Sequence, residues 1–87
     1  MNTRLMSQAL IYCGQKCTVN KYEMNVNGIR MIVRDNTIFS DSGMTSFHGA
    51  GQFLTLMFYE GIVIGADKDK ILQYYNSLVQ SKSFVTK

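Results

Sequence analysis

Residues 22–33 have the sequence YEMNVNGIRMIV, in which an apolar residue recurs at every second position on both sides of Asn27-Gly28. A period of two is typical of a β-strand that buries one face. Asn and Gly both accept the positive φ that a two-residue type I′ turn requires. The stretch therefore predicts an antiparallel hairpin with its turn at Asn27-Gly28.

A second two-residue turn is predicted at Asp35-Asn36, a pair that also accepts positive φ. Such short connections join antiparallel strands and fix their register. The predicted strands span residues 17–26, 29–34 and 37–41. The register assigns these side chains to the core face: Tyr22, Met24, Val26, Ile29, Met31, Val33 and Ile38.

Helical spacing of apolar residues appears before and after the predicted strands. The predicted helices span residues 3–13, 46–60 and 67–81. Asn2 or Thr3 is expected to cap the first, and Asp67 the last. The other predicted segments are a loop at residues 42–44, a connector at 62–65 and a frayed tail at 84–87. The predicted fold class is α+β: a three-stranded antiparallel meander covered by helices, in the order α-β-β-β-α-α.

Composition is that of a globular protein, with 46% hydrophobic and 17% charged residues, and we expect residues 1–87 to form a single domain. No apolar run approaches the ~20 residues of a membrane helix. The apolar stretch near Met1 is too short for a secretory signal. We therefore expect a cytoplasmic (intracellular) protein with no membrane partner.

Residue types that perform catalysis or bind metals are scarce in this chain. Cys13, Cys17 and His48 supply three zinc ligands where a structural site needs four, and no second ligand pair follows. A Cys-His-Asp arrangement with Asp41 has no supporting local signature. The cysteines are expected to be small, partly buried apolar residues, with a disulfide or redox pair as the alternative. We expect no catalytic residue, no metal, no cofactor and no enzymatic activity.

Two other segments have both a structural and a functional interpretation. Gly49-Ala50-Gly51 opens a predicted helix, where free backbone N–H groups attract anions; close packing of the helix start is the simpler interpretation. Asp67 and Asp69 lie at another helix start, where carboxylates offset the helix dipole, and no further carboxylate completes a calcium site.

The outer face of the predicted sheet carries the candidate site. Its register places Ile32 directly opposite Phe39, and both point away from the predicted core. An apolar pair flanked by cations is typical of a binding hot spot. The candidate partner-binding residues are Arg30, Ile32, Arg34, Phe39 and Lys21. The alternative is that a helix covers this face and makes a second small core.

Helical side chains outside the core stripes offer a second patch, which consists of Leu56, Tyr59 and Tyr74. This patch predicts either a homodimer formed through the helices or packing at the rim of the core.

The order of the elements resembles that of some small phage anti-CRISPR inhibitors, which block a host nuclease by binding it. The resemblance lies in topology and involves no shared motif. It implies a small non-enzymatic module that binds another protein or protein complex through the Arg-rimmed apolar surface, as a viral inhibitor of a host defence nuclease would.

The order α-β-β-β-α also resembles that of a double-stranded-RNA-binding domain. That family places lysines at the start of its second helix to contact phosphates. The corresponding stretch here, residues 46–52, contains no lysine. The alternative function is therefore nucleic-acid binding through the sheet face, with Phe39 stacking on a base and Arg30 and Arg34 on phosphates. A net charge of +3 permits either partner.

Overall fold

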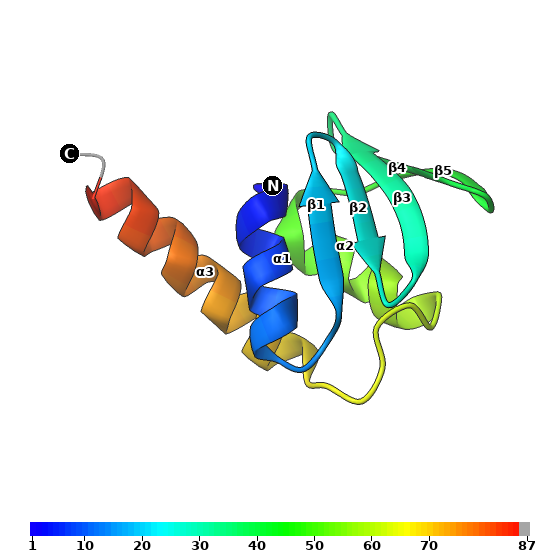
Figure 1. The fold of residues 1–87 in the computed structure, drawn as a ribbon. Helices are drawn as coiled ribbons and strands as arrows, with labels where there is room; N and C mark the ends of the chain where they lie inside the picture. The colour runs from blue at the N-terminus through cyan, green and yellow to red at the C-terminus, as the bar shows by residue number, and fades with distance from the viewer. Residues whose placement is uncertain (86–87) are drawn as a thin grey trace.

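The computed structural model describes residues 1–85, and for residues 82–85 only the backbone. It is an α+β fold in which a five-stranded antiparallel sheet follows one helix and precedes two others. The elements are α1 (Thr3–Tyr12), β1 (Cys17–Asn20), β2 (Glu23–Val26), β3 (Ile29–Arg34), β4 (Thr37–Ser40), β5 (Gly43–Ser46), α2 (Gly49–Tyr59) and α3 (Lys68–Val85). The strands form a meander in chain order, as Figure 1 shows.

Both predicted two-residue turns are present. Asn27 and Gly28 have φ values of 52° and 89°, and Asp35 and Asn36 have φ values of 52° and 60°. Positive φ at both central residues is the signature of a type I′ turn, whose twist matches that of the flanking strands. The predicted register is confirmed, because Met24 pairs with Met31 and Ile32 with Phe39.

The prediction of three strands is wrong, and the first error lies in residues 17–26. Lys21 has a φ of 55° and breaks this segment into β1 and β2, which pair with each other around a turn at Lys21-Tyr22. The assignment of Tyr22 to the core is also wrong, since this turn leaves it 54% exposed. Ile29 is 45% exposed because it lies beside the turn at the end of the sheet.

The second error concerns the segment after β4. The sequence predicts a loop at residues 42–44 and a helix that begins at Ser46, but Gly43–Ser46 forms β5 and pairs with β4. Asp41-Ser42 is therefore another two-residue connection. The helix begins later, at Gly49, because β5 must end before the chain can cross to the helical layer.

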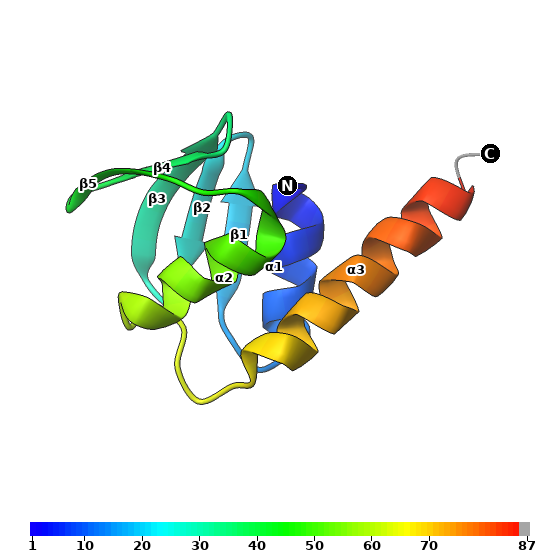
Figure 2. The same cartoon turned by 180° about the vertical axis from the view of Figure 1, so that it is seen from behind.

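The helices pack against one face of the sheet. Figures 1 and 2 show α2 behind the strands in one view and in front of them in the other, with α1 beside β1. The core lies between the layers and forms one cluster of buried side chains. Its largest fully buried members are Phe47, Phe53, Met6, Leu10, Met24, Met31, Leu54, Met57 and Ile71.

The predicted caps of two helices are confirmed. The side chain of Asn2 accepts a hydrogen bond from the Leu5 backbone N–H of α1, at 3.1 Å. Asp67 precedes α3 and accepts from the Asp69 N–H at 2.9 Å. The helix α3 is longer than predicted and extends through residues 84–85 of the expected frayed tail. Residues 86 and 87, the rest of that tail, lie outside the described residues.

The α2 helix ends where Gly61 takes a φ of 72°. The Gly61 N–H donates to the carbonyl of Phe58 and the Ile62 N–H to that of Met57, which is the Schellman arrangement. The chain then runs to α3 without a regular element. Within residues 1–85, we find no helix of the length and apolar character needed to cross a membrane.

Candidate functional site

The face of the sheet opposite the helices is open in the described structure. Figures 1 and 2 show that no helix among residues 1–85 lies over it. Three apolar side chains lie on this face in adjacent strands, because Ile32 pairs with Phe39 and Phe39 with Met44. We call Ile32, Phe39 and Met44 the outer row. Their exposed fractions are 40%, 40% and 70%, so the alternative of a second core beneath a helix does not apply to this face.

Met44 belongs to the candidate site, although the sequence predicts a loop at this position. It lies on β5 directly opposite Phe39, and so extends the apolar pair to the edge of the sheet. The sequence does contain a sign of this position, since Asp41-Ser42 separates two short segments as the other two-residue turns do. This sign indicates a turn but not a strand, because residues 43–46 show no alternation of apolar and polar side chains.

The two arginines of the candidate site are on the same strand and flank Ile32. The Nε of Arg30 lies 3.1 Å from Oε2 of Glu23. The guanidinium of Arg34 lies 4.9 Å from the centre of the Tyr22 ring, within range of a cation–π contact. Both contacts are exposed and therefore weak, but they restrict the directions in which the arginines point.

The third predicted cation, Lys21, lies in the β1–β2 turn and is exposed. The backbone carbonyl of Tyr22 accepts a hydrogen bond from the Val33 N–H. The β1–β2 turn therefore lies at the same end of the sheet as Arg34. The structure thus brings Lys21 near Arg34, and places it apart from Arg30, which pairs with Asn25 nearer the opposite end of the strands.

Acidic side chains balance the cations of this face. Glu23 pairs with Arg30, and the Oδ2 of Asp35 lies 3.8 Å from the Nε of Arg34. Asp41 lines a shallow hollow of about 360 Å³ together with Arg30, Ile32 and Phe39. A mixed-charge rim around an apolar centre is the usual anatomy of a protein interface.

The helical patch of the sequence analysis is not a continuous surface. Leu56 is half-buried and packs against the core, and the ring of Tyr74 stacks on that of Tyr12 at 4.0 Å between centroids. Only Tyr59 is strongly exposed, at 83%. Rim packing therefore accounts for Leu56 and Tyr74.

The two cysteines are free and half-buried, and both pack against the core. Burial raises the pKa of the Cys17 thiol, and a hydrogen bond with Ser7 partly offsets this rise. A raised pKa disfavours the thiolate, which is the reactive form of cysteine. Cys17 therefore has the environment of a packing residue.

His48 and Asp41 lie at opposite ends of β5, so the strand separates them by roughly 13 Å or more. Within residues 1–85, no cluster of three or more His, Cys, Asp and Glu side chains has the geometry to hold a metal ion. The structure therefore does not bring the residues of the Cys-His-Asp arrangement together.

The start of α2 packs closely on α3. A Cβ placed on Gly51 would lie 3.6 Å from a methyl carbon of Leu72, an ordinary contact distance between two helices. The side-chain oxygen of Gln52 accepts a hydrogen bond from the His48 N–H and so occupies one of the free donors of this helix start. Gly51 therefore lies in the contact between α2 and α3, whereas Gly49 has a φ of 80° and open space at its Cβ position.

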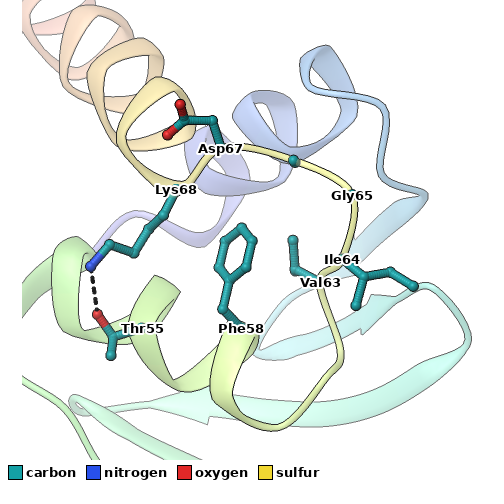
Figure 3. A pocket seen from close by; sticks show the side chains of 8 residues that line it. Thr55, Phe58, Val63, Ile64, Gly65, Asp67 and Lys68 are labelled. Carbon is teal, nitrogen blue, oxygen red and sulfur yellow. Dashed lines mark hydrogen bonds between the residues drawn. The ribbon is translucent and has the colours of Figure 1, made fainter.

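A broad, open hollow lies between the end of α2 and the start of α3 (Figure 3). Phe58 and Val63 line its apolar part. The Nζ of Lys68 donates to the hydroxyl of Thr55 at 3.1 Å. The carboxylate of Asp67 points away from the Phe58 ring and serves as the cap of α3. At this hollow, Lys68 thus links α3 to α2, and Asp67 caps α3.

Comparisons with models of protein families, with curated proteins and with solved structures found no match for this chain. The functional interpretation therefore depends on the geometry and charge of the molecule's own surfaces. Among the surfaces of residues 1–85, the outer row is the one where three large exposed apolar side chains lie side by side on paired strands.

Proposed function

We propose that this protein is a small non-enzymatic binding module whose outer sheet face docks another protein or protein complex. The observation that carries the proposal is the outer row, which lies exposed on a face with no helical cover and has charged side chains around it. Covering these three side chains would contribute about 1–2 kcal/mol each to binding. Arg30, Arg34 and Lys21 would then orient the partner by contacts at the rim.

The backbone beneath the site is well suited to binding. Ile32 and Phe39 are on strands joined by a type I′ turn, and the opposite face of the same strands is anchored in the core by Met31, Val33 and Ile38. Side chains on such a scaffold are held in place before the partner arrives, which reduces the entropy lost on binding.

A finer proposal is that the partner is a host defence nuclease and that the protein inhibits it. This proposal depends on the resemblance to phage anti-CRISPR inhibitors in element order. The resemblance assumed three strands, and the sheet has five. The docking surface would be the same, so the finer proposal adds the identity of the partner and no further residues.

Nucleic-acid binding by the sheet face is the alternative proposal, and the exposed ring of Phe39 favours it because bases stack on such rings. The carboxylates of Glu23 and Asp35 beside the two arginines oppose it, since they lower the positive potential that phosphates require. We therefore rank protein binding first.

The test is capture of cross-linked partners from the native cells by the wild type and by two variants. Phe39→Ala removes the centre of the outer row, and Tyr59→Ala removes an exposed aromatic ring elsewhere as a matched control. We expect a partner that the wild type and Tyr59→Ala retain and Phe39→Ala loses. Equal capture by all three would contradict the proposed surface. Retention on heparin that falls steeply with salt would favour nucleic acid instead.

A further inference from the structure

The strand β5 is an open edge of the sheet. It pairs with β4 on one side, and all four of its residues are exposed. The Phe47 N–H donates to the Asn36 carbonyl, so residues 36 and 47 form a hydrogen-bonded pair. Such pairs alternate along an antiparallel ladder, and the N–H and C=O groups of Met44 and Ser46 therefore point outward from β5. Outward backbone groups of this kind are a template for another strand.

This edge lacks the usual protection against strand addition. Proteins commonly protect open edges with charged residues or proline. The chain contains no proline, and residues 42–59, which include β5 and the whole of α2, contain no Lys, Arg, Asp or Glu. Two identical copies that meet along β5 would therefore bring no like charges together, although each copy has a net charge of +3.

We propose that two copies of this chain pair β5 with β5 in antiparallel orientation about a two-fold axis, with Met44 opposite Met44 of the second copy. The hydrophobic pattern selects this register, since a shift by two residues on one strand would place Met44 beside Ser46. In the proposed register, the outer rows of both copies join into one row across a ten-stranded sheet. Across the axis, the backbone N–H of each Met44 donates a hydrogen bond to the carbonyl of the other Met44.

The shape of the molecule permits this approach. Figures 1 and 2 show the β4–β5 hairpin extending away from α1 and α3, and all four residues of β5 are exposed, so this edge is open to a second copy. The interface is small, since each copy contributes a strand of four residues and the side chain of Met44. Interfaces well below the standard ~1,600 Å² are weak, so we expect an equilibrium between monomer and dimer that depends on concentration.

The first measurement is sedimentation equilibrium of the wild-type protein over a concentration series that reaches about 1 mM, the upper end of weak association. We expect the apparent mass to rise from the monomer value of 9.9 kDa toward twice that value. A mass that stays at the monomer value through the whole series would overturn the proposal.

The second measurement tests the register with variants that place opposite charges at residue 44. Met44→Lys and Met44→Glu each place like charges opposite each other in a homodimer, so we expect each variant alone to be monomeric and an equimolar mixture to regain the wild-type mass. Met44 is 70% exposed, so both variants are expected to fold, which thermal melts verify. The control is Thr18→Lys, which adds a positive charge at an exposed position on the outer face of β1, the other edge strand. This variant should associate like the wild type.

Two results of this second measurement would overturn the proposal. If both Met44 variants associate as the wild type does, the copies meet through another surface, such as the helices around Tyr59. If the variants are monomeric and their mixture is monomeric as well, Met44 does not face Met44 of the second copy.

Discussion

The side-chain amide of Asn27 donates a hydrogen bond of 2.7 Å to the Oε1 of Gln15, which links the central turn of the sheet to the connection between α1 and β1. The same amide donates to the carbonyl of Ile62, after α2. Gln15 is 8% exposed, and its own amide donates to the carbonyl of Ile64. Three connections that are distant in sequence are thus held together by two amide side chains.

We expect Asn27→Gly to lower the free energy of unfolding by about 2 kcal/mol, because it removes three side-chain hydrogen bonds, partly exposed, that each contribute about 0.5–1.5 kcal/mol. Glycine keeps the positive φ of this position, so the turn itself remains possible. Urea unfolding measures the change. The matched control is Asn36→Gly, because Asn36 also has a positive φ, of 60°, in a two-residue turn. Within residues 1–85, the side chain of Asn36 makes no hydrogen bond that this change would remove. Equal losses in both variants would contradict the role of the Asn27 network.

We expect Gly28→Val to lower the free energy of unfolding by about 1–3 kcal/mol, since a β-branched residue resists the φ of 89°. No heavy atom beyond its chain neighbours lies within 4 Å of the Cβ position, so strain and not a clash causes the loss. Gly28→Asn should cost less, because Asn tolerates positive φ. Thermal melts of the three proteins check this order, and an unchanged midpoint for Gly28→Val would exclude the type I′ turn.

Phe39→Ala should cost less than about 1.5 kcal/mol of stability, because the ring is 40% exposed and leaves no closed cavity. Phe53→Ala should cost about 3–5 kcal/mol, because that ring is fully buried in the core. Chemical unfolding of both variants makes the comparison. A loss for Phe39→Ala as large as for Phe53→Ala would show that this face is covered in solution, and the outer row would then be a second core.

The pH dependence of stability is expected to include a contribution from Cys17. Burial raises its pKa in the folded state, and the Ser7 hydrogen bond opposes this rise to a smaller extent. The thiol's contribution to the free energy of unfolding is therefore fully present at a pH below its pKa in the unfolded state, about 8.5. This contribution is lost as the pH rises through the pKa of the thiol in the folded state.

The measurement compares urea unfolding of the wild type and of Cys17→Ala between pH 7 and pH 10. We expect the difference in stability between them to shrink as pH rises, because only the wild type loses the contribution of the thiol. Cys13→Ala is the control, as Cys13 is also half-buried. A wild-type advantage that grows with pH would contradict the raised pKa.

Much of the sheet was predictable because its determinants are local. Asn27-Gly28 and Asp35-Asn36 accept positive φ, and a period of two around them fixes the register. That register was sufficient to place Ile32 opposite Phe39, the centre of the candidate site. The break at Lys21 was not predictable in the same way, because Lys seldom takes the left-handed conformation that pairing of β1 with β2 imposes here.

The sequence by itself determined the two type I′ turns, the pairing around them and the apolar faces of the helices, since each follows from backbone preference and from the period of apolar residues. Only the tertiary structure decided that Gly43–Ser46 is a strand. This segment has neither alternation nor a β-branched run, and it is extended because β4 supplies its hydrogen bonds. The tertiary structure also decided that the outer row is exposed, because the side on which helices pack depends on contacts between elements distant in the chain.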